Sequence, residues 1–175
     1  ITRFGSAVRD QIVWRPATDT VWRPVNVGRV LTDGWEASLG VRAPLALGAS
    51  ARLDAVATRT DARDQSDPAS ATYDQPLLYV PDRQLKVALS VGGRRFSADG
   101  ELVHTGRRYT TADGSAWLAP TTVLAAGVRV GEARADGAVS LAVRVENLTD
   151  LRYEVVRGYP MPPRHVSFRL SLTTR

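Results

Sequence analysis

Few residues of this chain have the types and spacing that catalysis or metal binding requires. The two histidines, His104 and His165, fall near the ends of different predicted strands, and the chain contains no cysteine. Asp61, Asp64 and Asp67 are spaced like neither an EF-hand nor a calcium-binding repeat, which indicates solvated loop acids. The sequence therefore predicts no enzyme, no cofactor and no metal site.

Charged side chains on one face of the predicted strands are better functional candidates. The alternating segments place apolar residues on one side and charges of both signs on the other. Facing a closed lumen, these charges need partners on neighbouring strands or on a second domain. They form either a ladder of cross-strand ion pairs or a surface that docks a plug and passes a charged ligand. The predicted lumen-facing residues are Glu36, Arg52, Asp54, Lys86, Asp99, Glu101, Arg129, Arg144, Glu146 and Arg169.

The charge balance argues against nucleic-acid binding. The net charge is +5, and Lys86 is the only lysine, so arginine supplies almost all the positive charge. The arginines are spread along the chain and interleaved with acids, whereas a nucleic-acid surface gathers them into a patch. Arginine suits ion-pair networks in confined polar space, although compositional bias of the source genome explains the preference equally well.

Eight segments alternate with period two, and each is nine or more residues long. This exceeds the usual strand and matches the length that a tilted strand needs to cross a bilayer. No run of apolar residues reaches the length of a transmembrane helix, and no signal-peptide pattern opens the chain, which we interpret as cleavage or excision. The segments are Ile1–Arg15, Gly28–Arg42, Leu47–Thr60, Arg83–Val91, Arg95–Arg107, Thr122–Val130, Ala138–Glu146 and His165–Thr174.

The third segment has an unusual apolar face. Its apolar positions include Ala49, Ala51, Ala55 and Ala57, where other segments carry valine, leucine or phenylalanine. Such small side chains make a weak surface for contact with lipid, and the sequence alone offers no reason for them.

The connections between segments alternate in length. Short turns are predicted at Ala43–Ala46, Gly92–Arg95 and Gly131–Gly137, and long loops at 16–26, 61–82, 108–121 and 147–164. Successive connections of a meander lie at opposite ends, so all the short turns share one rim and all the long loops share the other. Outer-membrane barrels have this asymmetry, and a soluble sandwich has little reason to keep it.

Aromatic residues gather at the predicted long-loop rim. Large ring surfaces at this rim predict contact with an extracellular ligand, and other aromatics near the strand ends fit an interfacial girdle. The ligand-contact candidates are Trp22, Tyr73, Tyr79 and Trp117.

The stretch NLTDLRYEVVRGYPMPPR, followed by an alternating strand, resembles the C-terminal signature of TonB-dependent outer-membrane receptors. Two upstream stretches, Trp22–Leu39 and Tyr79–Leu89, are similar to the beginnings of strands in that family. Pro163 stands where the family usually has glycine, and Thr174-Arg175 stands where it usually ends in an aromatic residue. The matching positions are Asn147, Leu148, Asp150, Tyr153, Glu154, Gly158, Tyr159, Pro160, Met161, Pro162 and Arg164.

The resemblance implies an all-β fold, an antiparallel up-and-down transmembrane β-barrel. Residues 1–175 would supply about eight strands as the C-terminal part of a barrel of twenty-two, with the plug domain and earlier strands absent. It also implies a receptor in the bacterial outer membrane that imports a siderophore, cobalamin or similar chelate. The implied partners are outer-membrane lipid and lipopolysaccharide, the receptor's own N-terminal plug, the TonB complex and the ferric-siderophore or cobalamin-like ligand.

Three rival readings remain open on the residues alone. A complete eight-stranded outer-membrane barrel would act as a structural anchor or adhesin. A soluble all-β binding module is disfavoured by the loop asymmetry, and a barrel enzyme lacks a visible set of nucleophile and base.

Overall fold

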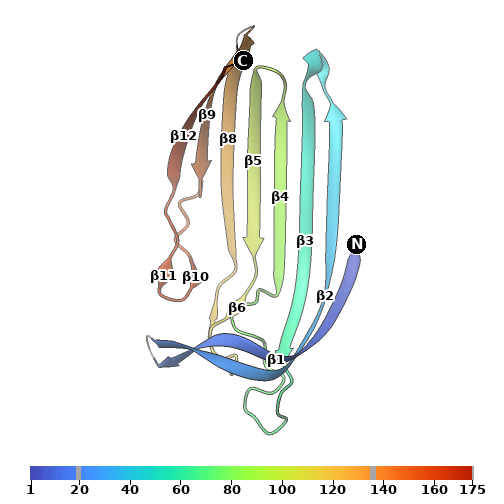
Figure 1. Ribbon diagram of the computed structural model, residues 1–175, viewed down its shortest axis with the longest axis vertical. Helices are drawn as coiled ribbons and strands as arrows, with labels where there is room; N and C mark the ends of the chain where they lie inside the picture. The colour runs from blue at the N-terminus through green and yellow to red at the C-terminus, as the bar shows by residue number, and fades with distance from the viewer. Residues whose placement is uncertain (19–20, 135–136, 175) are drawn as a thin grey trace.

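The computed structural model describes residues 1–18, 21–134 and 137–174, and its main element is one antiparallel sheet of eight long strands (Figure 1). Each long strand pairs with the next long strand in the chain, which confirms the predicted meander. The strands are β1 (Thr2–Thr18), β2 (Val21–Pro44), β3 (Ser50–Asp64), β4 (Arg83–Gly92), β5 (Phe96–Thr105), β8 (Thr121–Arg134), β9 (Gly137–Glu146) and β12 (His165–Thr174). No helix among the described residues has both the length and the apolar character needed to cross a membrane.

After the β1–β2 hairpin, the connections lie as the sequence predicts, with short ones at one end of the sheet and long ones at the other (Figure 1). At the short end a 3₁₀ turn at Ala46–Gly48 joins β2 to β3, and residues 93–95 join β4 to β5. At the long end the loops carry two small hairpins, β6 (Arg108–Tyr109) with β7 (Trp117–Leu118), and β10 (Glu154–Val156) with β11 (Tyr159–Pro160).

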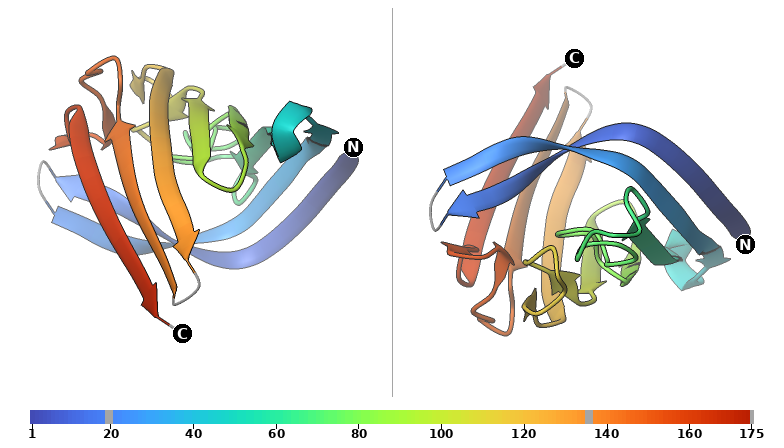
Figure 2. Two further views of the ribbon diagram at one scale, coloured as in Figure 1. Left: turned by 90° about the horizontal axis from the view of Figure 1, so that it is seen from above. Right: turned by 90° about the horizontal axis from the view of Figure 1, so that it is seen from below.

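The first predicted long loop is instead a continuation of the β1–β2 hairpin. Pro16 pairs with Trp22 and Thr18 with Val21, so the connection shrinks to residues 19–20, which lie outside the described part of the chain. Proline, threonine and aspartate there suggested a loop, but continuous cross-strand pairing outweighs these local preferences. The hairpin bends across the long-loop end of the sheet toward β10 and β11 (Figures 1 and 2).

The prediction that Leu47 begins the third strand is wrong. Leu47 lies in the 3₁₀ turn with φ at 59°, and its side chain is fully exposed. The third strand begins at Ser50 because the left-handed turn at Leu47 and Gly48 must first reverse the chain. The last short connection also tightens, since β8 reaches Arg134 and β9 begins at Gly137.

The register gathers aliphatic side chains on one face of the sheet. Directly paired residues face the same side, so Leu39, Ala55 and Val87 form one apolar row, and Val143 with Phe168 belongs to another. Phe168 is 73% exposed, and no second layer of the described chain covers this face. An aliphatic face left open in this way requires an apolar surrounding, which a soluble sandwich would supply from its second sheet.

The buried core is small and lies at the long-loop end. Val27, Val30, Ala62 and Leu77 are each less than a tenth exposed and pack together, with Val13 and Val80 against them. The loop after β3 reaches this core because residues 74–82 turn back and run alongside the last residues of β3. The Leu77 amide donates there to the Ala62 carbonyl. The long loops are therefore packed on the end of the sheet.

The sheet is strongly curved and remains open (Figure 2). Its first and last strands, β1 and β12, each pair on one edge only among the described residues. An unpaired edge exposes a row of backbone donors and acceptors that a further strand would satisfy. The curvature is that of a wall segment, because the two edges do not meet.

Gly34 allows β1, β2 and β3 to pack closely. A Cβ atom there would lie 2.5 Å from Cζ of Phe4, whose ring covers the glycine, and would also collide with the Arg59 carbonyl oxygen. We expect Gly34→Ala to lower the free energy of unfolding by about 1–3 kcal/mol, because two strands must separate. Thermal unfolding of the purified full-length protein in detergent, followed by circular dichroism, measures the loss.

Gly40→Ala is the matched control on the same strand and the same face. The nearest atom to its new Cβ would be Asp54 Oδ1 at 3.5 Å, an ordinary contact. Equal midpoints for the two variants would contradict the close packing assigned to Gly34.

Candidate functional site

Arg144 is the centre of a charge network on the polar face of the sheet. Its guanidinium on β9 donates to Glu146 on the same strand and to Asp99 and Glu101 on β5, the last at 3.0 Å. Lys86 Nζ on β4 lies 2.9 Å from the other side of Glu101. Five predicted lumen-facing residues are thus joined into one network.

Arg144 reaches β5 because the intervening strand carries glycine at the crossing point. Asp99 on β5 pairs directly with Gly127 on β8, and Gly127 pairs directly with Arg144 on β9, so the three residues form one row across the sheet. A Cβ atom on Gly127 would lie 3.0 Å from Asp99 Oδ1. Without a side chain at this position, the guanidinium crosses β8 over its backbone.

The other predicted lumen-facing residues behave in two ways. Arg52 and Asp54 form a local two-point ion pair along β3, with Arg52 Nη2 at 2.8 Å from Asp54 Oδ1. Glu36, Arg129 and Arg169 make no ion pair within the described residues. Arg129, Arg144 and Arg169 line a hollow of about 230 Å³, in which Asp99 is the one carboxylate, so this part of the face is cationic.

Asn147 holds the last long loop in shape. It is 3% exposed, and its amide nitrogen donates to the carbonyls of Leu151 and Pro162 at 2.9 and 3.3 Å. Its amide oxygen accepts from the Leu151 backbone N–H at 2.9 Å. The backbone has φ of 51°, a left-handed conformation that asparagine tolerates better than most residues.

Other residues of the resemblance fold the same loop. Asp150 accepts from the Arg164 backbone N–H at 2.8 Å, and Glu154 accepts from the Gly158 backbone N–H at 3.1 Å. Gly158 has φ of 82°, which glycine adopts without strain. The Leu148 backbone N–H donates to the Leu124 carbonyl at 2.8 Å and so ties the loop to β8. Tyr153 accepts through its carbonyl from the Met161 N–H, whereas Tyr159 and Pro160 lie in the exposed strand β11.

The predicted ligand-contact aromatics are divided between two neighbourhoods. Trp22 and Tyr79 lie together with ring centroids 5.6 Å apart, although Trp22 comes from a strand. Trp117 lies apart from this pair beneath the guanidinium of Arg107, 5.0 Å from the ring centroid. Tyr73 is half-buried in the loop after β3 and makes no aromatic contact among the described rings.

Two aromatic residues were missing from the predicted set. Trp14 and Tyr159 join Trp22 and Val156 around an almost wholly apolar hollow of about 460 Å³ between the β1–β2 hairpin and the last loop. Their pairing arises from the bend of the hairpin, which the sequence pattern did not reveal. Tyr159 belongs to the family motif, but only the fold places it on the same hollow as Trp22.

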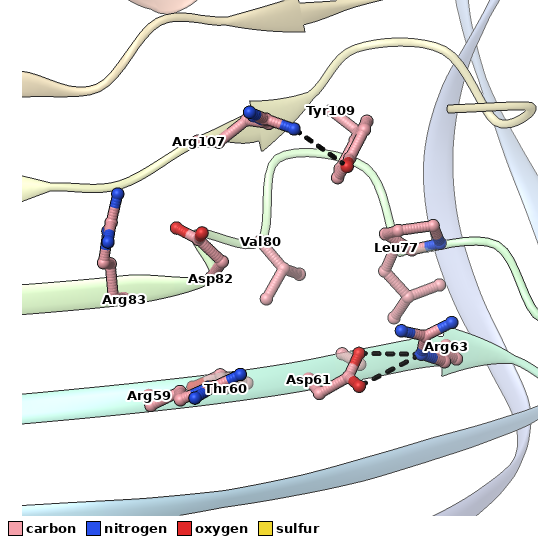
Figure 3. Close-up of a pocket in the computed structure, with 12 residues that line it drawn as sticks. Arg59, Thr60, Asp61, Arg63, Leu77, Val80, Asp82, Arg83, Arg107 and Tyr109 are labelled. Carbon is pink, nitrogen blue, oxygen red and sulfur yellow. Dashed lines mark hydrogen bonds and ion pairs between the residues drawn. The ribbon is translucent and has the colours of Figure 1, made fainter. Parts of the chain in front are cut away.

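A second hollow, of about 370 Å³, opens where β3 meets the loop that follows it (Figure 3). Arg63 donates there to Asp61 at 2.9 Å, and the Arg107 guanidinium lies 3.5 Å from the Tyr109 hydroxyl. The charged residues that line this hollow are Arg59, Asp61, Arg63, Asp82, Arg83 and Arg107.

The loop between β5 and β8 contains two groups with altered acidity. Hydrogen bonds from Ser115 and Thr111 lower the pKa of Asp113 to about 2, so this carboxylate stays charged and braces its turn. Burial lowers the pKa of Arg108, whose guanidinium donates to the carbonyls of Glu154 and Val155 in the last loop. The two loops are thereby joined.

The two histidines make separate contacts within the sheet and the last loop. His104 contacts Thr122 Oγ1 at 2.9 Å on the neighbouring strand, and His165 contacts the Pro163 carbonyl at 3.1 Å. Within the described ranges, no cluster of three histidine, aspartate or glutamate side chains has the geometry of a metal site.

Removing the charge of Arg144 tests the network. We expect Arg144→Gln to lower the free energy of unfolding by about 1–2 kcal/mol, because three carboxylates lose a shared cation at a partly exposed site. Thermal unfolding of the full-length protein in detergent measures the change. Arg169→Gln on the same face is the control and is expected to have little effect, so equal losses would refute the network's role.

Shortening Asn147 tests the last loop. We expect Asn147→Ala to cost about 2–3 kcal/mol locally, because the partly buried Leu151 N–H loses its acceptor and alanine disfavours a positive φ. Limited trypsin digestion at Arg152 and Arg157 should become several-fold faster. Asn26→Ala removes one exposed hydrogen bond of 3.3 Å to Asp10 and should leave the rate unchanged; an unchanged rate in Asn147→Ala would contradict the assignment.

Comparison with known proteins agrees with this geometry. The family model of the TonB dependent receptor-like β-barrel matches residues 3–148, and no curated protein matches the chain. Among solved structures, the siderophore receptor PiuA from Acinetobacter baumannii superposes with a TM-score of 0.71 at 17% identity, covering 98% of this chain and 25% of that one.

Two further solved structures give the same picture. BauA, the ferric preacinetobactin receptor from Acinetobacter baumannii, has a TM-score of 0.69 at 17% identity, covering 98% of this chain and 26% of that one. The copper transporter OprC has a TM-score of 0.70 at 18% identity, covering 98% of this chain and 28% of that one. The chain thus spans about a quarter of the length of these proteins. With most of its length matched by the family model and its open sheet superposing on part of their structures, it belongs to the TonB-dependent receptor β-barrel family and forms a segment of such a barrel.

Proposed function

We propose that this chain is part of the barrel wall of an outer-membrane receptor that imports a scarce chelate with energy from TonB. The observation that carries the proposal is the pairing of an uncovered aliphatic face with long folded loops at one end of the sheet. Lipid would contact the aliphatic face, and the long loops would meet the exterior. Outer-membrane lipid and lipopolysaccharide are then the immediate neighbours.

The two open edges support a barrel larger than eight strands. Neither β1 nor β12 is paired on its outer side within the described residues, and an eight-stranded barrel would join these strands to each other. We infer that residues 1–175 form the C-terminal wall of a longer chain whose other strands complete the barrel. This arrangement argues against a complete small barrel that serves as an anchor or adhesin.

The polar face is suited to an N-terminal plug. Arg129 and Arg169 point into the same hollow as Arg144 but lack carboxylate partners among the described residues. Carboxylates of a plug would pair with them, and the pairing would leave the Arg144 network undisturbed. Partial exposure makes such pairs weak and reversible, as a plug that moves during import requires.

The ligand is expected at the long-loop end, beside the rings of Trp22 and Tyr79. Their faces and the neighbouring apolar hollow with Trp14 and Tyr159 offer a surface for a large organic chelate. Solved relatives are named as receptors for ferric preacinetobactin and ferripyoverdine, which favours a ferric siderophore over cobalamin for this chain.

The full-length protein in detergent tests this proposal with three probes. The probes are a ferric hydroxamate siderophore, a ferric catecholate siderophore and cyanocobalamin. Binding of each probe is measured by the quenching of tryptophan fluorescence. We expect one ferric complex to bind, and Trp22→Ala with Tyr79→Ala to weaken its binding at least tenfold, because stacked ring area is lost. Trp35→Ala, on the aliphatic face, is the matched control and should bind like the wild type.

Uptake by whole cells tests the coupling. Transport of the bound chelate should stop in cells that lack TonB, while binding to those cells persists. Uptake that continues without TonB would refute the coupling, and a folded outer-membrane protein that binds none of the probes would refute the ligand class.

A further inference from the structure

We propose that the outer face of β3 and β4 binds a phosphate-bearing membrane lipid in an amphipathic groove. The inference rests on the proposed outer-membrane location and adds a site that is separate from the chelate and the plug. Two adjoining hollows form the groove, and both are lined by Arg59 and Arg83. One hollow is mainly apolar and the other is cationic.

The register places the groove on the aliphatic face. Arg59 is two residues beyond Ala57 and pairs with Trp35, while Arg83 is two residues before Leu85. Period-two alternation therefore keeps both arginines on the side of the aliphatic rows. They come directly after the last apolar residues toward the long-loop end, at the level where lipid headgroups begin.

Arg59 and Arg83 are directly opposite each other across β3 and β4. Like charges in this arrangement repel and destabilise a sheet, unless an anion lies between them. Neither guanidinium has a carboxylate within ion-pair distance among the described residues, although Arg52, Arg63 and Arg144 all have one. The opposed pair is thus a cationic site without an internal counter-ion.

Of the other charged residues that line the cationic hollow, only Arg107 adds positive charge that no described carboxylate pairs. Arg63 is held by Asp61 and by Asp74 at 3.3 Å, so it lies beside the hollow with its charge already paired. Arg107 is held over the ring of Trp117 and contributes charge without a carboxylate partner among the described residues. Asp82 is the remaining acid on the lining, and it makes no ion pair within the described chain (Figure 3).

The apolar half of the groove has room for an acyl chain. Trp35, Ala57, Leu85 and His104 line a hollow of about 560 Å³ directly below the arginines. Along β3 the apolar positions continue as Ala55, which lies between Leu39 and Val87. The small side chains of Ala55 and Ala57, unexplained by the sequence, stand lower than Leu39, Val87 and Leu85 beside them and leave space on this face next to the hollow.

The chemistry of the two halves identifies the occupant. A guanidinium donates two parallel hydrogen bonds to a phosphate, and two opposed guanidinium groups suit an exposed phosphomonoester. Free phosphate shares this head chemistry but would gain nothing from the apolar hollow below. Contact with both halves favours a lipid of the outer leaflet whose phosphate lies at the interface.

Thermal-shift titration of the delipidated full-length protein in non-ionic detergent tests the proposal. The probes are dioctanoyl phosphatidic acid, dioctanoylglycerol and inorganic phosphate, which present head and chains, chains alone, and head alone. We expect phosphatidic acid to raise the unfolding temperature of the protein. Its affinity, obtained from the titration, should be at least tenfold higher than that of dioctanoylglycerol or inorganic phosphate. The double variant Arg59→Gln with Arg83→Gln should bind phosphatidic acid at least tenfold more weakly.

The variants also make a prediction in the absence of lipid. Because the substitution removes like-charge repulsion, the lipid-free double variant should unfold at the same temperature as the wild type or higher, which separates lost binding from lost folding. Arg94→Gln is the matched control, because Arg94 is an exposed arginine at the opposite rim, and it should bind phosphatidic acid as the wild type does.

Two results would overturn the proposal. One is an unchanged affinity for phosphatidic acid in the double variant, and the other is binding of inorganic phosphate as tight as that of phosphatidic acid. The ferric siderophore probes are measured on the same preparations. Chelate binding without lipid binding refutes this inference alone, whereas lipid binding without chelate binding refutes only the proposed function.

Discussion

The unbroken register of the antiparallel sheet is the constraint on which the rest of the structure depends. Each long strand uses its backbone donors and acceptors on its neighbours in chain order, so directly paired side chains always share a face. A slip of one residue would move the aliphatic row of that strand to the polar side and its polar row to the aliphatic side. The aliphatic rows, the charge network and the opposed arginines are all consequences of this single pairing scheme.

An ion-pair network forms on the polar face of the sheet, whereas two arginines on the aliphatic face have no ion pair among the described residues. On the polar face Arg144 satisfies three carboxylates, and Gly127 gives it the path across β8. On the aliphatic face Arg59 and Arg83 oppose each other without any such acid. The first arrangement is complete within the described chain, whereas the second has no carboxylate within ion-pair distance among the described residues.

Much of the fold could be predicted from sequence, because period-two alternation over nine or more residues is a strong local signal. All eight long strands are confirmed, and so is the division into short and long connections for every connection except the first. The continuation of β1 and β2 through Pro16 and Trp22 was missed, since loop-forming residue types there are outweighed by cross-strand pairing. Leu47 was misassigned because a left-handed turn has no periodicity.

The site was less accessible to sequence reasoning, for a geometrical reason. The alternation assigns a residue to a face, but only the register shows which residues on different strands lie in one row. Arg144 and Asp99 are far apart in sequence and separated by a whole strand in space, so their contact depends on a glycine in a third strand. Trp14 and Tyr159 line one hollow only because the hairpin bends, and no local pattern encodes that bend.

The last loop has a consequence for how a ligand would be met. Asn147, Asp150 and Glu154 each bind backbone groups within the loop, so its conformation is set by its own side chains. The entropy of ordering that segment is lost on folding, before any ligand arrives. The last loop is therefore preorganised before any ligand binds. For the proposed ligand site, adjustment of shape is then expected on the opposite side of the aromatic hollow, where the hairpin carries Trp14 and Trp22.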